Sequence, residues 1–195
     1  TSKGKSLALD ELISVLPSAY QSKLTAFRVQ GDLDFDGTIA GVLSSQLSPT
    51  VSLDFEVIDG KLKRQGGDYA LEQLYLKGYL SNGVGQQLKT SRLVIDSSSA
   101  DFGLGHLQCS ATVIDFTRPF LQLSSSSSID LAAVHDFFQF NQLSFLAGHL
   151  NIKLQHSGFL ADLDINNTSN LKDLGTLGNA HLTNASFGLP GNDQV

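Results

Sequence analysis

The residues 32–37, which read Asp-Leu-Asp-Phe-Asp-Gly, are the strongest candidates for metal chemistry in this chain. Carboxylates at positions 1, 3 and 5 followed by glycine open an EF-hand loop, in which they wrap a calcium ion. The twelfth position of that loop needs a bidentate glutamate, and here it is Leu43. Because apolar residues separate the aspartates, we predict one β-strand with its carboxylates facing solvent, and weak surface binding of calcium as the alternative.

Histidine and cysteine side chains bind a metal tightly only when three or four of them converge. The single cysteine, Cys109, follows the alternation of Leu107, Ala111 and Val113, so we expect a small core side chain and not a reactive thiol. The five histidines are spread singly along the chain, and we expect them on the solvent faces of strands: His106, His135, His149, His156 and His181.

The sequence motifs of common enzyme classes are missing. The chain has no Gly-x-Ser-x-Gly elbow, no phosphate-binding loop and no dinucleotide fingerprint, and no set of nucleophile, base and orienting partner can be named. Gly83-Val84-Gly85 and Gly103-Leu104-Gly105 precede no predicted helix and are interpreted as turn or bulge glycines. We therefore expect a protein that is not an enzyme and has no cofactor. The formal net charge of -6 argues against nucleic acid as a partner.

The elements that carry these residues are β-strands, because apolar and polar residues alternate with period two along most of the chain after Ala26. A strand with such alternation buries one face and exposes the other. The apolar set predicted to share one face comprises Val29, Leu33, Phe35, Leu53, Phe55, Val57, Leu74, Leu76, Leu93, Ile95, Leu121, Leu123, Leu150, Ile152 and Leu154.

Two segments have helical periodicity instead. Residues 6–24 place leucines on one stripe, and Pro17 interrupts them, so a helix is expected over about residues 8–15 and a short second piece after the proline. Residues 131–141 are expected to form a short helix capped by Asp130. The predicted organisation is an N-terminal helical segment, 1–25, and an antiparallel β domain, 26–195.

Turn dipeptides predict where the strands reverse. Asp59-Gly60 and Asn82-Gly83 favour tight hairpins, and Ser157-Gly158 suggests a short connection between two late strands. The serine run 124–128 keeps the register of Leu123 before it and Ile129 after it, so we interpret it as strand and not as a hinge, with a flexible linker as the alternative.

The chain also has features of an excised piece. It starts at Thr1, contains no methionine, and has neither a signal-peptide pattern nor an apolar run near 18 residues. We expect a part of a longer polypeptide, with any membrane anchor or export signal outside this segment.

The order of segments resembles the AsmA-like family of bacterial envelope proteins, whose relatives include TamB and, more remotely, bridge-like lipid-transfer proteins. The resemblance covers about residues 26–164 and lies in loosely spelled strand motifs. These are Gly31-Asp32-Leu33-Asp34-Phe35-Asp36-Gly37, Pro49-Thr50-Val51-Ser52-Leu53-Asp54-Phe55 with Asp59-Gly60-Lys61-Leu62, Phe120-Leu121-Gln122-Leu123, Ser128-Ile129-Asp130-Leu131-Ala132-Ala133-Val134, and the strand from Gly148 to Leu154.

The resemblance implies a long, curved antiparallel sheet with an apolar groove that shields lipid acyl chains or packs against neighbouring β modules of the same protein. It places the chain in the periplasm or cell envelope of a Gram-negative bacterium, in lipid transport or outer-membrane assembly. A closed barrel or a two-sheet sandwich fits the alternation equally well. The alternative function is a structural or adhesive domain that binds proteins by edge strands or loops, with Tyr69, Tyr75 and Tyr79 as its candidate cluster.

Overall fold

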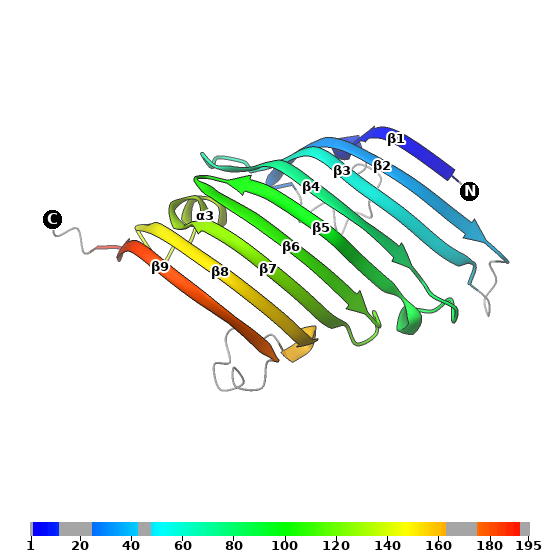
Figure 1. Ribbon diagram of the computed structural model, residues 1–195. Helices are drawn as coiled ribbons and strands as arrows, with labels where there is room; N and C mark the ends of the chain where they lie inside the picture. The colour runs from blue at the N-terminus through cyan, green and yellow to red at the C-terminus, as the bar shows by residue number, and fades with distance from the viewer. Residues whose placement is uncertain (1, 12–24, 43–47, 163–174, 192–195) are drawn as a thin grey trace.

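The computed structural model describes residues 2–11, 25–42, 48–162 and 175–191. In these ranges the chain forms one antiparallel sheet of nine strands whose spatial order is the order of the sequence (Figure 1). Figure 1 shows a curved sheet in which β1 and β9 are the two edges and do not meet. The prediction of a mainly antiparallel β fold is confirmed, and the sheet is open, not closed into a barrel. The strands are β1 (Ser2–Ala8), β2 (Phe27–Ala40), β3 (Thr50–Arg64), β4 (Ala70–Ser81), β5 (Arg92–Phe102), β6 (Gly105–Ile114), β7 (Phe120–Asp130), β8 (Phe145–Phe159) and β9 (Thr176–Gly188).

One α-helix, α3 (Leu131–Phe138), follows β7 directly, as predicted. The Asp130 carboxylate caps it by accepting hydrogen bonds from the backbone N–H groups of Ala132, at 3.0 Å, and Ala133, at 3.5 Å. The helix ends at Gln139, whose left-handed backbone (φ 52°) stops it two residues before the expected Asn141.

Helix α3 covers one end of the sheet and builds the hydrophobic core there. Phe137 is 5% exposed and its ring lies 5.3 Å from that of Phe102 and 5.5 Å from that of Phe27. Two further contacts hold α3. Arg64, the last residue of β3, donates to the carbonyl oxygen of Phe137, and the Asp136 carboxylate accepts from the backbone N–H groups of residues 68 and 69 in the β3–β4 connection. The helix is therefore held by both packing and hydrogen bonds.

The start of the chain differs from the prediction of an N-terminal helical segment. Residues 2–8 form strand β1, which pairs with β2 through Leu7 opposite Leu33. Residues 9–11 are helical, in agreement with the helix expected over about residues 8–15, and the rest of that helix lies outside the described residues. Leucine spacing near the N-terminus suits a strand or a helix, and pairing with β2 decides for the strand.

The Asp59-Gly60 hairpin prediction is wrong, because β3 continues through this dipeptide. Asp59 has a positive φ of 51°, and two residues of β3 lie opposite the single residue Gly31 of β2. Asp-Gly supplies the backbone freedom that a β-bulge needs as well as that of a turn. A Cβ atom on Gly31 would lie 2.7 Å from the Cα of Gly60, so the two strands approach too closely for a side chain.

Two other predicted connections and the predicted strand at the serine run have mixed outcomes. Asn82-Gly83 does lie between two paired strands, but the connection extends to Ser91 and includes the 3-10 turn Leu88–Thr90, so the turn is not a tight one. Ser157-Gly158 is not a connection, since β8 continues to Phe159. The serine run belongs to β7, as predicted.

Candidate functional site

The candidate site is one face of the sheet, here called the apolar face. Because antiparallel partners point their side chains to the same side, the register shows which residues share it. Leu33, Val57 and Leu76 are consecutive partners across β2, β3 and β4, and Ile95, Ala111 and Leu123 are consecutive partners across β5, β6 and β7. The remaining predicted residues fall on the same face by the same counting, on β2 (Val29, Phe35), β3 (Leu53, Phe55), β4 (Leu74), β5 (Leu93), β7 (Leu121) and β8 (Leu150, Ile152, Leu154).

The side chains of the apolar face are mostly half-buried, and no second sheet of the described residues covers them. Val57 is 5% exposed and Leu33 is 9% exposed, whereas the other predicted residues are half-buried. Helix α3 lies over one end of the face, against Leu62, Leu71 and Phe102. A half-buried apolar surface of this length is what a ligand or partner of the same character would cover.

Several members of the apolar face escaped the sequence prediction because bulges interrupt the alternation. Leu62 lies five residues after Val57, and Leu71 lies three residues before Leu74, yet the register places all four on the apolar face. The bulges at Asp59-Gly60 and at Gln73 (φ 50°) cause these shifts. Leu80 and Phe102 belong to the face as well. Leu107 and Val113, which the alternation around Cys109 does indicate, also lie on it.

Small side chains occupy the middle of the apolar face on β5, β6 and β7. Ser98, Cys109 and Ser125 are consecutive partners there. The Ser98 hydroxyl lies 3.0 Å from the Cys109 carbonyl oxygen and 2.9 Å from its sulfur, and the Ser125 hydroxyl donates to the Gln108 carbonyl oxygen. Because these hydroxyls are satisfied within the sheet, they do not require water or a polar ligand on this face.

His156 contradicts the expectation that the histidines lie on solvent faces. It lies opposite Leu123 on the apolar face and is 6% exposed. Its Nδ1 atom is 2.8 Å from the Thr176 hydroxyl oxygen, and its buried Nε2 atom has no hydrogen-bond partner among the described residues. His156 is two residues after Leu154 and therefore points to the same face of β8, but a histidine at such a position does not by itself indicate burial.

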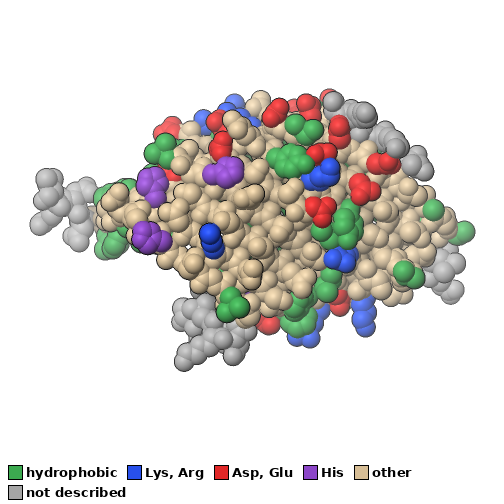
Figure 2. All heavy atoms as spheres, viewed as in Figure 1, with side chains coloured by type: hydrophobic (Ala, Val, Ile, Leu, Met, Phe, Trp, Pro, Cys, Tyr) green, Lys and Arg blue, Asp and Glu red, His purple; other side chains and the backbone are tan. Residues whose placement is uncertain are grey.

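The opposite face, here called the polar face, carries the charged groups. Glu56 accepts a hydrogen bond of 2.6 Å from the Tyr75 hydroxyl and lies 3.6 Å from the Lys77 ammonium. The hydrogen bond to the Glu56 carboxylate raises the pKa of Tyr75, since it holds the phenolic proton. In the view of Figure 2, charged and histidine side chains are spread over the surface and hydrophobic ones form only small patches.

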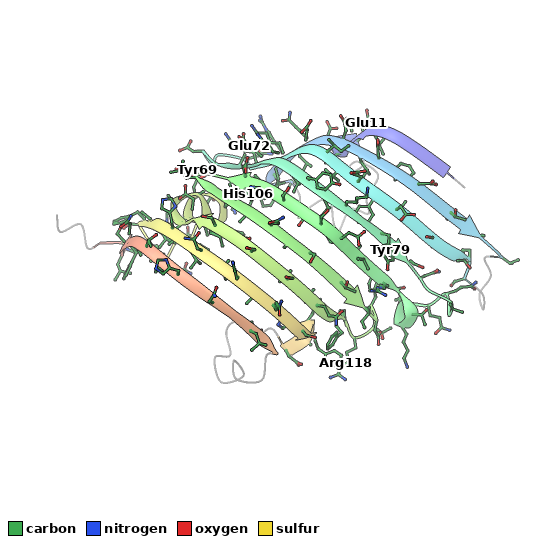
Figure 3. All side chains as sticks on the ribbon, in the orientation of Figure 1. Glu11, Tyr69, Glu72, Tyr79, His106 and Arg118 are labelled. Atoms are coloured by element: carbon green, nitrogen blue, oxygen red, sulfur yellow. The ribbon has the colours of Figure 1, made fainter. Side chains whose placement is uncertain are left out.

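The three tyrosines do not form a single cluster. Tyr69 packs against the core beneath α3, whereas Tyr75 and Tyr79 lie on the polar face of β4. Figure 3 shows Tyr69 beside α3 and Tyr79 farther along the sheet. The exposed aromatic pair is instead Phe138 and Phe140, which stack with ring centroids 5.8 Å apart and are 55% and 38% exposed.

A hollow of about 500 Å³ extends from β5 to the start of β9, and one of about 400 Å³ lies along β7, β8 and β9. Most of the residues that line them belong to the polar face. They share Ser124, Gln155 and Leu177. Short serine side chains on β7, beside longer ones on β8, leave this space. Both linings can form hydrogen bonds, and the 500 Å³ hollow also includes Ile95, Ala111, Leu123 and His156 of the apolar face.

Metal binding has no geometric support in the described part of the chain. Residues 32–36 lie on strand β2 and not in a loop, and within the described ranges no group of three or more His, Cys, Asp or Glu side chains converges. The EF-hand spacing is therefore explained by strand alternation.

Comparisons with known proteins add no relative. No family model, curated protein or solved structure matches the chain. Among the helices within the described residues, none has the length and apolar character needed to cross a membrane.

Proposed function

We propose that this chain is a non-enzymatic module that shields lipid acyl chains on its apolar face. The observation that carries the proposal is the one-sided face itself, on which aliphatic and aromatic side chains from β2 to β8 align across an open sheet. The alternative of a closed sandwich core loses support, since the described residues contain a single sheet. Each buried methylene of an acyl chain contributes about 0.8 kcal/mol.

The wider setting of the proposal rests on the resemblance to AsmA-like proteins. In that setting the module belongs to the envelope of a Gram-negative bacterium and takes part in lipid transport or outer-membrane assembly. Its partners are lipid acyl chains or neighbouring β modules of the same protein, and a segment outside this chain provides the membrane anchor.

The test uses native mass spectrometry of the purified protein, followed by analysis of extracted lipid and by titration with a fluorescent fatty acid. The Ile152→Asp variant places a carboxylate on the apolar face and is expected to weaken uptake at least tenfold. Asn151→Asp is the matched control, because Asn151 is the adjacent residue of β8 on the polar face and is exposed. Circular dichroism establishes that both variants keep the sheet.

The proposal fails if the protein carries no lipid and takes up no fluorescent fatty acid. It also fails if both folded variants bind the probe equally well, because the binding surface would then lie elsewhere.

A second candidate function, protein binding through exposed aromatic residues, is favoured by the stacked pair Phe138 and Phe140 at the end of α3. Aromatic side chains dominate the energy of many protein interfaces. A Phe138→Ser, Phe140→Ser variant that loses a protein partner but keeps lipid uptake would favour this second function.

A further inference from the structure

Three connections between strands lie together at the end of the sheet that is opposite α3 (Figure 1). They join β2 to β3, β4 to β5 and β6 to β7, and all six of these strands have paired neighbours on both sides. The surface is therefore not the edge of the sheet. It is here called the loop end, and its described residues are 41–42, 48–49, 82–91 and 115–119 with the adjoining strand ends.

Hydrogen bonds join the β4–β5 connection to the connections on either side of it. On one side, the Asn82 side-chain oxygen accepts from the backbone N–H of Val51, at 2.8 Å, and its NH₂ group donates to the carbonyl oxygen of Pro49, at 2.7 Å. On the other side, the backbone N–H of Phe116 donates to the carbonyl oxygen of Leu88, at 2.8 Å. The loop end is therefore one preformed surface and not a set of separate loops.

The β4–β5 connection presents aliphatic side chains to solvent. Val84 is fully exposed and Leu88 is 63% exposed. Val84 stands between two glycines that close the chain around Thr90, since a Cβ atom on Gly83 or on Gly85 would collide with Thr90. Because both glycines pack inward, the side chain between them projects outward.

The neighbouring end of β2 adds two more exposed aliphatic side chains. Ile39 is 71% exposed, and Val42 in the β2–β3 connection is 67% exposed. Ile39 follows the alternation of Leu33 and Phe35, so the loop end borders the apolar face. A single exposed aliphatic side chain is normal, whereas four on one rigid surface indicate contact with an apolar partner.

Exposed cations accompany these aliphatic side chains. Lys89 and Arg92 lie at the end of the β4–β5 connection. Arg118, in the β6–β7 connection, lies over the ring of Phe159, 3.8 Å from its centroid, and Figure 3 shows it at this end of the sheet. Asp115 is the only carboxylate in the sequence of the three connections, and it accepts hydrogen bonds from two backbone N–H groups of its own turn.

The nearest carboxylates on the adjoining strands are too distant to neutralise these cations. Asp36, Asp54 and Asp96 each lie four residues inside β2, β3 or β5. That is about 13 Å from the loop end at about 3.3 Å per residue, which exceeds the Debye length of about 8 Å at physiological ionic strength.

The end of β8 and the start of β9 limit the extent of the basic surface. They lie at the same end of the sheet, and the sequence between them contains Asp162, Asp164, Lys172 and Asp173. This acidic connection is not part of the loop end. The contact is therefore assigned to the region from β2 to β7, where cations outnumber carboxylates.

We propose that the loop end docks on a bilayer surface that contains anionic lipid. The four aliphatic side chains enter the boundary between headgroups and acyl chains, and the three cations contact headgroup phosphates. The formal net charge of -6 helps to orient the molecule, because the acidic remainder is repelled by the same surface. This inference goes beyond the shielding of acyl chains and does not depend on it.

The first test is titration with vesicles, followed by flotation of the bound protein. The vesicles contain phosphatidylcholine mixed with phosphatidylglycerol. Val84→Gln, Leu88→Gln is expected to raise the dissociation constant for these vesicles at least tenfold. Leu104→Gln, Phe138→Gln is the matched control, because both residues are exposed at the opposite end of the sheet. Circular dichroism establishes that each variant is folded.

The second test separates the contribution of charge. Lys89→Glu, Arg92→Glu is expected to weaken binding to the mixed vesicles at least tenfold, and added salt should weaken binding of the unmodified protein to them. Vesicles of phosphatidylcholine alone should bind both proteins equally weakly. Arg28→Glu, Lys153→Glu is the matched control, since both residues are exposed on strands away from the loop end.

A fluorescent label locates the contact. In a Cys109→Ser background, an environment-sensitive fluorophore attached to Val84→Cys should shift its emission to shorter wavelength when mixed vesicles are added. The same label on Leu104→Cys, in the β5–β6 turn, is the control and should not shift.

Binding to mixed vesicles that both loop-end variants weaken, with a shift confined to the label at Val84→Cys, supports the proposal. Absence of vesicle binding overturns it and leaves a protein as the partner of the loop end. Binding that tolerates both loop-end variants, or an equal shift at Leu104→Cys, overturns it as well. Uptake of the fluorescent fatty acid is measured on the same variants and should be unchanged, so the docking proposal and the acyl-chain proposal can fail separately.

Discussion

Asp130 joins three parts of the structure, and its replacement tests whether α3 is held as described. One carboxylate oxygen caps α3, and the other accepts a 3.0 Å hydrogen bond from the backbone N–H of Leu104 in the β5–β6 turn. The residue is 5% exposed, so water does not replace these contacts when the carboxylate is removed. The turn itself is tight at this point, since a Cβ atom on Gly103 would lie 2.5 Å from the same carboxylate oxygen.

The expected loss of stability follows from the separate contacts. Removal of a helix cap costs about 1 kcal/mol, and a hydrogen bond to a charged group contributes about 1.5–3 kcal/mol. Asp130→Ala should therefore lower the free energy of unfolding by about 2.5–4 kcal/mol. Asp130→Asn should cost less, because its amide oxygen can still cap α3 while its NH₂ group faces the N–H of Leu104.

Urea unfolding followed by far-ultraviolet circular dichroism measures these differences, provided that the dependence on urea is unchanged. Replacement of the exposed Asp54 by alanine is the control and should change stability by less than about 0.5 kcal/mol. The reasoning is refuted if Asp130→Ala matches this control, or if the asparagine variant is as unstable as the alanine variant.

Other side chains give expectations of the same kind. Phe137→Ala should cost about 3–5 kcal/mol in urea unfolding, because a buried aromatic ring leaves a cavity under α3, and a loss below 1 kcal/mol would contradict the packing described. Gly78→Ala should lower the melting temperature strongly, because its Cβ would lie 2.0 Å from the Val94 carbonyl oxygen, and an unchanged melting temperature would show that β4 and β5 are farther apart. Tyr75 should ionise above its ordinary pKa of 10.0 in an ultraviolet titration, and Glu56→Gln should move the pKa back toward that value. Since the folded-state pKa of Tyr75 is raised, the stability that this hydrogen bond contributes is present below pH 10 and is lost as the pH rises through the folded-state pKa. An unchanged Tyr75 titration in the Glu56→Gln variant would exclude the hydrogen bond as the cause of the raised pKa.

The strands and their apolar side could be predicted from the sequence because partition between protein and water acts on each side chain separately. Leu53, Phe55 and Val57 need only their own alternation to indicate a face, and the register confirms that they share it with Leu33. The N-cap at Asp130 could be predicted in the same way, because an Asp directly before an apolar helical stripe needs only the neighbouring backbone N–H groups to act as a cap.

The features that could not be predicted depend on contacts between distant segments. Asp59-Gly60 fits a hairpin or a bulge, and the close approach of Gly31 decides between them. Leu7 fits a helix or a strand, and pairing with Leu33 decides. Whether the sheet closes depends on whether its two edges meet, which no local pattern contains.

The strict agreement between chain order and spatial order bears on how the molecule folds. Each strand pairs with the strand made just before it, so the sheet can lengthen one hairpin at a time, with low contact order at every step. The packing of Phe137 against Phe27 is different, because most of the length of the chain separates these two residues in the sequence. Docking of α3 is therefore the step with the largest loop to close, and the seven strands from β1 to β7 precede it in the order of synthesis.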